Sequence, residues 1–218
     1  MKSKKLTFLI LSGPTKEYID PVRFISNESS GKMGNALAQA ALKRKCDVIF
    51  ISGPSSVFSN NIKLIKVTTA LEMFKEAKLN FKKADIVISA AAITDYCPVI
   101  TYKRKIKKNK AEMLIKLKRN PDIIGYCGKN KKNQVVAGFA LETENLIDNA
   151  RLKLKSKKLD LITANGKESL GSDSATMYII NVDGVLEIKN KNKKIIAEKI
   201  IGETIRMFKN IESGKKIS

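Results

Sequence analysis

The 218-residue sequence predicts an α/β fold: a Rossmann-like, doubly wound, mostly parallel sheet with helices on both faces, a C-terminal β-hairpin and a basic flap. Three observations lead to this prediction. Short apolar segments, typical of buried strands, alternate with helical patterns along most of the chain. The dipeptide Asp183-Gly184 separates two strand-like runs near the C-terminus. The stretch from Tyr96 to Lys118 is the least regular part of the chain.

The predicted elements follow one another in a regular order. Strands are expected to begin at Leu6, Asp47, Ile62, Asp85, Val135 and Asp160. Helices are expected over residues 33–44, 70–81, 121–129, 145–158 and 195–208. Because no linker divides the chain, we expect residues 1–218 to form a single domain, with residues 96–118 as a mobile flap or an arm that reaches a partner subunit.

The charge of the chain indicates attraction to anions. Forty-two Lys and Arg residues face 21 Asp and Glu residues, and the net charge is +21. Between Lys103 and Arg119 there are nine basic residues and one acidic residue. Nucleic acid, phosphorylated metabolites, a solvated surface and a lysine-rich codon bias are all compatible with this pattern.

The absence of histidine excludes several kinds of chemistry. Without it the chain has neither the usual general base nor the commonest metal ligand, so Ser-His-Asp hydrolysis and histidine-based zinc sites are excluded. Three cysteines without C-x-x-C spacing argue against a disulfide framework and a zinc knuckle, and favour a reducing compartment.

The apolar segments are too short for secretion or membrane insertion. The run from Leu6 to Leu11 is shorter than the hydrophobic part of a secretion signal and ends in a turn. No other apolar run approaches the length that crosses a bilayer. We therefore expect a cytoplasmic protein that does not bind membranes.

The loop after the first predicted strand is unusually long. It runs for 18 residues from Gly13 to Ser30, and such length at the end of a parallel strand suggests function. Gly31 and Gly34 then open the first helix, either because free N–H groups bind a phosphate there or because the helix packs closely on the sheet. The pattern is neither G-x-G-x-x-G nor a P-loop, and no acidic residue follows the second strand, which disfavours dinucleotide binding.

Two further features lie beside predicted strand ends. Asp95 follows a run of alanines after the fourth strand, where small residues allow either the approach of a planar ring or tight packing. Lys153 and Lys157 are four residues apart and share one helix face, where they contact either a ligand or solvent.

Taken together, the motifs resemble phosphopantothenoylcysteine synthetase. The resemblance covers nearly the whole chain, from "SGPTKEYIDPVRFISNESSGKMG" through "AAITDY", "KIKK", "NPDII" and "GFALET" to the lysine-rich helix before "DLITAN". It implies a ligase of coenzyme A biosynthesis that joins 4'-phosphopantothenate to L-cysteine. The substrate carboxylate is activated by a nucleotide, CTP or ATP, as an acyl-nucleotide with release of pyrophosphate, and the cysteine amine then attacks.

The resemblance also implies cofactors and partners. Mg²⁺ accompanies CTP, and no protein residue is assigned as its ligand. The enzyme is expected to be a homodimer that binds neither nucleic acid nor membranes. Because nothing precedes the first strand, we expect a free-standing synthetase whose decarboxylase partner is a separate chain.

Site residues follow from the resemblance position by position. Asn27 matches the asparagine that contacts the acyl-nucleotide, Arg23 matches a neighbouring arginine, and Lys105 matches the lysine implicated in forming the intermediate. The residues expected at the nucleotide, besides Lys105, are Ser89, Ala90, Ala91, Asp95, Pro121, Asp122, Ile123, Ile124, Phe139, Lys153 and Lys157. The expected phosphate or substrate loop comprises Gly13, Ser29, Ser30, Gly31 and Gly34.

Two positions depart from the family pattern. Pro14 stands where the family usually has glycine, which removes one backbone N–H that could bind phosphate. Cys97 follows Asp95-Tyr96 in place of a frequent arginine.

Two rival functions remain as alternatives. A nucleic-acid-binding module would interleave aromatic residues with the basic ones, yet Tyr102 is the one aromatic residue near them. An NAD(P)-dependent oxidoreductase would carry a dinucleotide fingerprint and a catalytic Tyr-x-x-x-Lys, and the chain has neither.

Overall fold

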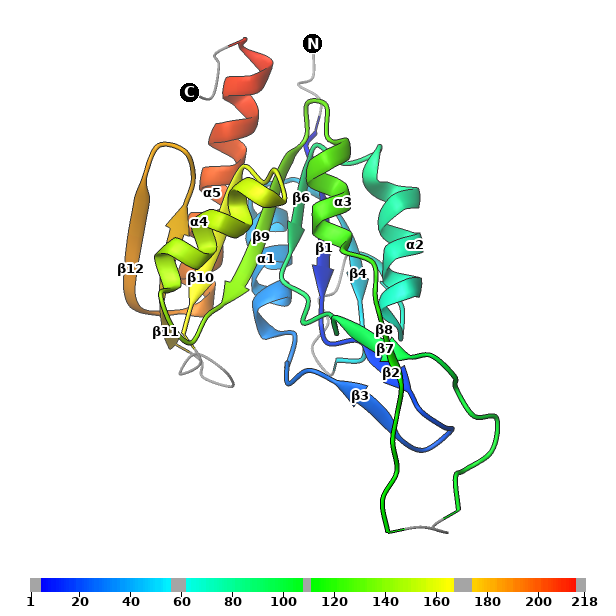
Figure 1. The fold of residues 1–218 in the computed structure, drawn as a ribbon. Helices are drawn as coiled ribbons and strands as arrows, with labels where there is room; N and C mark the ends of the chain where they lie inside the picture. Colours follow the sequence, from blue (N-terminus) through cyan, green and yellow to red (C-terminus); the bar gives the residue numbers. More distant parts are fainter. Residues whose placement is uncertain (1–4, 56–61, 108–110, 167–173, 215–218) are drawn as a thin grey trace.

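A central sheet of eight strands organises the computed structural model, which describes residues 5–55, 62–107, 111–166 and 174–214 (Figure 1). The strands stand in the order β12-β11-β10-β9-β6-β1-β4-β5. Their bounds are β1 Thr7–Ser12, β4 Asp47–Ser52, β5 Lys63–Lys66, β6 Ile86–Ser89, β9 Val135–Leu141, β10 Leu161–Asn165, β11 Ser174–Ile180 and β12 Val185–Asn192. From β10 to β5 all neighbours pair in parallel, whereas β11 is antiparallel to both β10 and β12.

Five helices cover the two faces of the sheet among the described residues (Figure 1). They are α1 Lys32–Lys43, α2 Ala70–Phe81, α3 Ile123–Asn130, α4 Leu146–Ser156 and α5 Lys193–Glu212. Because side chains alternate along a strand, Phe8 and Ile10 pack on one face with α1 and α5, while Leu9 and Leu11 pack on the other with α2, α3 and α4. The doubly wound fold predicted from the sequence is thus confirmed.

The strand order reverses beside β1. The chain passes from β1 outward through β4 to β5, and β6 then returns to the other side of β1 before β9 and β10 follow. In open parallel sheets, ligands bind at the carboxyl ends of the strands near such a reversal. The topology therefore predicts a ligand site among the loops after β1, β6 and β9.

Antiparallel strand pairs complete the fold among the described residues. The predicted C-terminal hairpin joins β11 to β12, and its turn is held by Asn181 Oδ1, which accepts hydrogen bonds from the N–H groups of Asp183 and Gly184. The long first loop contains a hairpin that was not predicted, β2 Lys16–Tyr18 with β3 Phe24–Ser26. Residues 96–118 include β7 Tyr96–Pro98, which pairs with β8 Leu117–Arg119.

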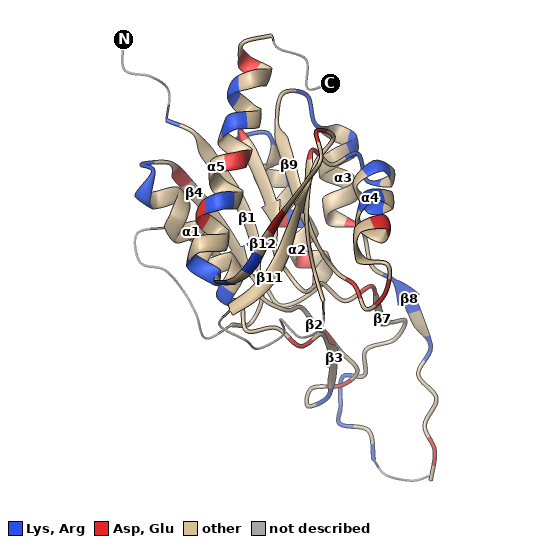
Figure 2. Cartoon of the chain, turned by 90° about the vertical axis from the view of Figure 1, so that its left-hand side faces the viewer, with Lys and Arg blue, Asp and Glu red and all other residues tan. Residues whose placement is uncertain are grey.

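Residues 99–107 and 111–116, called the arm below, extend from β7 and β8 at the lower right of Figure 1. Whether the arm moves or reaches a partner subunit stays a prediction. Lys and Arg residues are spread over α1, α4 and α5 as well as β8 (Figure 2). Within the described residues, no helix is long and apolar enough to cross a membrane.

Candidate active site

A pocket of about 540 Å³ lies at the carboxyl ends of β6 and β9, beside α3 and α4. Pockets that bind small molecules are commonly about 300–1,000 Å³ in volume. Its lining comprises Ser89, Ala91, Ile93, Thr94, Asp95, Tyr96, Arg119, Asn120, Pro121, Asp122, Ile123, Ile124, Gly138, Phe139, Lys153, Lys157, Leu159 and Ile162.

Ten of the twelve residues predicted at the nucleotide line this pocket. The two others are Ala90, whose N–H donates to Leu11 O at 2.9 Å within the sheet, and Lys105, which lies on the arm. The fold thus gathers residues from four separate segments of the sequence around one cavity. Their role in nucleotide binding stays a prediction.

Small residues form part of the wall between β6 and β9. Ser89 pairs with Gly138 on the neighbouring strand, and both line the pocket. A Cβ atom added at Gly138 would lie 2.9 Å from Cδ1 of Leu159, which also lines the pocket. A side chain at position 138 would therefore take space from a ligand.

The loop after β6 is held through Thr94. Its N–H donates to Thr15 Oγ1 at 3.1 Å, its carbonyl accepts from Asn120 Nδ2 at 2.9 Å, and its hydroxyl donates to Glu17 Oε1 at 3.2 Å. The N–H of Asn120 also donates to Asp95 O at 2.8 Å. These bonds fix the backbone beside Asp95, whose exposed carboxylate lines the pocket.

Sequence reasoning missed this polar network. Glu17 is 5% exposed and also accepts from the N–H of Ala70 at 2.8 Å, where α2 begins. Its partners lie 53 and 77 residues away along the chain, so no local spacing could have identified them.

Asp122 links the start of α3 to α4. Its Oδ1 accepts from the N–H of Gly125 at 3.1 Å and from Lys157 Nζ at 2.9 Å. A Cβ atom at Gly125 would come within 2.3 Å of Asp122 Oδ2, so a side chain there would displace the capping carboxylate from this position. The cap satisfies one of the N–H groups that a helix leaves unpaired at its start.

Lys153, the other lysine that lines the pocket, is also paired. Lys153 Nζ lies 2.6 Å from Oε1 of Glu142, whose side chain is 11% exposed and whose Oε2 accepts from Asn149 Nδ2 at 3.3 Å. Sequence reasoning missed Glu142, although it stands within "GFALET" directly after β9. Ion pairs with a half-exposed lysine are weak, about 0–1 kcal/mol, so a ligand with several negative charges can replace them.

Asn27 reaches the rim of the pocket. Its Nδ2 donates to Ile93 O at 3.0 Å, and Ile93 lines the cavity. A carboxamide nitrogen carries two protons, so a second donor is available for a ligand. Arg23, by contrast, directs Nη2 away from the pocket lining, to Ile106 O at 2.7 Å and Asp20 Oδ2 at 3.0 Å.

The glycine and serine residues at the start of α1 do not line this pocket. A Cβ atom at Gly34 would lie 2.0 Å from Ser12 Oγ, so close packing of α1 on β1 accounts for this glycine. Gly13 and Gly31 have φ values of 71° and 73°, in the left-handed region that favours glycine. Ser29 Oγ and Ser30 Oγ accept from the N–H groups of Gly31 and Lys32, both at 3.4 Å. A phosphate site at these residues stays a prediction.

The described residues contain no cluster of three or more His, Cys, Asp or Glu side chains that could hold a metal ion. Mg²⁺ is usually bound by one or two carboxylates together with substrate phosphates, and Asp95 presents a carboxylate of that kind to the pocket. Cys127 is disfavoured as a catalytic thiol, because burial and then the negative charge of Asp122 raise its pKa to about 12.

The fold and the pocket define a doubly wound α/β protein with a polar cavity at the carboxyl ends of its parallel strands. Residues 3–208 match the family described as the DNA/pantothenate metabolism flavoprotein C-terminal domain, and the chain belongs to this family. The family resemblance predicted from the sequence is confirmed.

Curated relatives of the chain include two coenzyme A biosynthesis bifunctional proteins CoaBC. The protein of Borreliella burgdorferi is 45% identical over 205 residues, which cover 92% of this chain and 52% of that protein. The protein of Haemophilus influenzae is 39% identical over 208 residues, which cover 93% of this chain and 52% of that protein. The chain therefore spans about half the length of the curated relatives it matches.

Solved structures agree with this assignment. The crystal structure of the C-terminal domain of a CoaBC protein has a TM-score of 0.81 at 32% identity, and the match covers 94% of this chain and 96% of that one. A Cab2 H337A mutant in complex with phosphopantothenate-cysteine has a TM-score of 0.78 at 18% identity, with 96% and 88% covered. The second likeness supports the fold alone.

Proposed function

We propose that this chain is a ligase that joins 4'-phosphopantothenate to L-cysteine and so forms 4'-phospho-N-pantothenoylcysteine in coenzyme A biosynthesis. The observation that carries the proposal is the gathering of ten expected nucleotide residues around one cavity in a member of this family. The pocket is lined by the cations Lys153 and Lys157, which suit phosphates, and by the small residues Ser89 and Gly138.

In the first step, the carboxylate of 4'-phosphopantothenate attacks the α-phosphorus of the nucleotide, which we propose to be CTP. An O–P bond forms, the bond to the bridging oxygen of pyrophosphate breaks, and an acyl-cytidylate results. Lys153 and Lys157 leave their carboxylate partners to hold phosphate oxygens, and Lys105 stabilises charge on the triphosphate. Mg²⁺, bound by the phosphates with Asp95 in reach, would neutralise part of their charge.

In the second step, the amine of cysteine attacks the acyl carbon. A C–N bond forms, the bond from the acyl carbon to the oxygen of CMP breaks, and the amine loses a proton. The second proton of Asn27 Nδ2 donates to the acyl oxygen as negative charge develops there. No covalent enzyme nucleophile is needed, so the absence of histidine is no obstacle.

We further propose that the protein acts as a homodimer in which a second copy of the chain covers the arm. Exposed apolar side chains follow one another along it, including Ile100 at 61%, Tyr102 at 51% and Leu114 at 98% exposure. Surfaces of this kind are usually covered by a partner. Since Lys105 does not line the pocket of its own chain, it reaches a nucleotide either by movement of the arm or across the dimer.

We propose that a decarboxylase activity is the functional partner of this ligase. The curated relatives are named bifunctional, and this chain matches about half of their length. The proposed product keeps the carboxylate of cysteine, so a decarboxylase can consume it. Adding a purified decarboxylase to the ligase reaction and measuring carbon dioxide release tests this coupling.

Release of pyrophosphate tests the main proposal. The purified protein is incubated with Mg²⁺ and 4'-phosphopantothenate, with CTP or ATP, and with or without cysteine. We expect cysteine to stimulate release with CTP more than with ATP. Stimulated release with ATP alone would retain the ligase and reverse the nucleotide preference. No release with either nucleotide would overturn the enzymatic proposal and favour the nucleic-acid-binding alternative.

A further inference from the structure

The arm is fastened to the body of the protein through the β2–β3 hairpin. Thr101 Oγ1 donates to Tyr18 O at 3.1 Å, and the N–H of Tyr102 donates to Ile19 O at 2.9 Å. The third attachment, at Ile106, uses charged side chains and differs from these two.

Asp20 and Arg23 together hold both backbone polar groups of Ile106. The N–H of Ile106 donates to Asp20 Oδ2 at 3.1 Å, and its carbonyl accepts from Arg23 Nη2 at 2.7 Å. The same Arg23 nitrogen lies 3.0 Å from Asp20 Oδ2, so the two side chains form a closed clamp on one residue of the arm.

Asp20 has one more carboxylate oxygen than the turn between β2 and β3 requires. The turn between β2 and β3 is satisfied by Oδ1, which accepts from the N–H groups of Val22 at 2.8 Å and Arg23 at 2.9 Å. Oδ2 and the guanidinium are then available for the arm. The side chain of Asp20 is fully buried, and a buried carboxylate is stable only with such partners.

The clamped residue is the immediate neighbour of Lys105. Consecutive Cα atoms are about 3.8 Å apart, so fixing the peptide groups of Ile106 also fixes the backbone from which Lys105 extends. Lys105 itself is exposed. Its position therefore depends on the hairpin rather than on contacts of its own side chain.

We propose that Asp20 is a positioning residue which, with Arg23, clamps the arm at Ile106 and thereby places Lys105 for formation of the acyl-nucleotide. This inference rests on the proposed ligase function. It assigns the two charges of "IDPVR" to the arm and not to the pocket: Asp20 acts through the arm, and Arg23 Nη2 serves the same clamp.

The variant Asp20→Asn tests the clamp with little change in shape. Its carboxamide oxygen still accepts from Val22 and Arg23, but its NH₂ group faces the N–H of Ile106 and the guanidinium of Arg23, which are both donors. We expect hydrogen exchange at the amide of Ile106 to be faster by about tenfold or more, as for loss of one hydrogen bond to a charged group. Thr101→Val, which removes a neighbouring arm contact, is the matched control and should leave Ile106 protected.

Kinetics then separate positioning from general damage. Acyl-nucleotide formation should slow by about tenfold or more in Asp20→Asn. When acyl-cytidylate is added to the variant, it should react with cysteine as fast as it does with the unmodified protein. If Asp20 acts through Lys105, the double variant Asp20→Asn, Lys105→Gln should be no slower than Lys105→Gln alone. Should Asp20→Asn fail to fold, Ile106→Pro removes the same N–H donor from the side of the arm and should show the same kinetic defect.

Two results would overturn the inference. One is an unchanged rate of hydrogen exchange at the amide of Ile106 in Asp20→Asn. The other is a double variant Asp20→Asn, Lys105→Gln in which acyl-nucleotide formation slows by the full product of the two single reductions. If the unmodified protein forms no acyl-nucleotide, the proposed function fails, and with it the role of Lys105. In that case, comparing hydrogen exchange at the amide of Ile106 in Asp20→Asn and in the unmodified protein still decides whether Asp20 holds the arm.

Discussion

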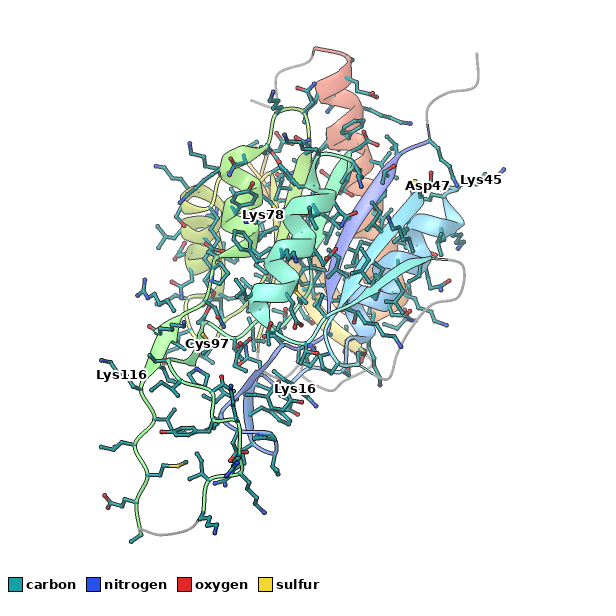
Figure 3. All side chains as sticks on the ribbon, turned by 90° about the vertical axis from the view of Figure 1, so that its right-hand side faces the viewer. Lys16, Lys45, Asp47, Lys78, Cys97 and Lys116 are labelled. Atoms are coloured by element: carbon teal, nitrogen blue, oxygen red, sulfur yellow. The ribbon has the colours of Figure 1, made fainter. Side chains whose placement is uncertain are left out.

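The pocket and the arm are built in opposite ways. The pocket is formed at the ends of buried strands, and each polar group of Thr94 has a partner within the chain. The arm has exposed residues throughout 111–116, and its attachments to the hairpin run through Thr101, Tyr102 and Ile106. Figure 3 labels Cys97, in β7 at the base of the arm, and Lys116, the residue of the arm that directly precedes β8. The pocket wall is thus held by bonds within the body of the protein, whereas the lysine expected to act on phosphates lies on a segment that is attached to the hairpin at three residues.

The largest effect is expected at Lys105, on the arm. Lys105→Gln removes a cation from the transition state of attack on the α-phosphate, and loss of such a charge lowers rates by about 10³-fold or more. Acyl-nucleotide formation, followed in a single turnover by pyrophosphate release, should therefore nearly cease. Lys107→Gln is the matched control, because it removes the same charge two residues away at another exposed position. Equal rates for the two variants would count against a specific role for Lys105.

A somewhat smaller effect is expected at Asn27, on the rim of the pocket. Asn27→Asp removes the donor aimed at the acyl oxygen, which typically costs about 10²- to 10³-fold in rate. Unlike the arm variant, it should still release some pyrophosphate and accumulate the acyl-nucleotide, while product formed with cysteine falls. Asn130→Asp makes the same change at the end of α3, where Nδ2 donates to Tyr126 O at 2.8 Å, and should keep full activity. Normal turnover of Asn27→Asp would contradict the proposed role.

The comparison also separates what the sequence could predict from what it could not. The short apolar runs around Leu9, Ile49 and Ile88 predicted the strands. Because parallel strands align their carboxyl ends, the sequence also predicted that residues near the ends of β6 and β9 lie close together. The partners of Glu17 and Asp20 could not be read in this way. Their bonds to Ala70, Thr94 and Ile106 reach across 53 to 86 residues, and the hairpin that presents them was itself not predicted.

A moderate effect on stability is expected from the cap of α3 in the pocket wall. Asp122→Ala removes the acceptor for the N–H of Gly125 and should lower the free energy of unfolding by about 1 kcal/mol, measured by urea denaturation. Asp122→Asn keeps an acceptor and loses the pairing with Lys157, in which both side chains are partly exposed, so it should cost only a few tenths of that value. A loss for Asp122→Asn as large as that for Asp122→Ala would show that the charge, which both variants lack, matters more than the cap.

The clamp on Ile106 predicts that the stability of the protein depends on pH. Burial favours the neutral form of Asp20, but the N–H groups of Val22, Arg23 and Ile106 and the Arg23 guanidinium outweigh it, and the pKa is lowered. A lowered pKa contributes stability above the ordinary aspartate value of about 3.9, and this contribution is lost as pH falls toward the folded pKa. The unmodified protein should therefore exceed Asp20→Asn in unfolding free energy at pH 6, and the difference should shrink toward pH 3. A constant difference would show that the ionised form is not favoured.

The smallest effect on the fold is expected at Leu114, which is 98% exposed on the arm. Leu114→Ser removes no contact within the described chain, so the free energy of unfolding at low protein concentration should change by less than about 0.5 kcal/mol. If a second copy covers the arm, the same change exposes a polar group to an apolar interface and should shift the molecular mass measured by light scattering from dimer toward monomer. Leu71→Ser, at a 65% exposed position on α2, is the matched control and should alter neither quantity. A dimer that persists in Leu114→Ser would place the interface elsewhere, and movement of the arm within one chain would then be the route by which Lys105 reaches the nucleotide.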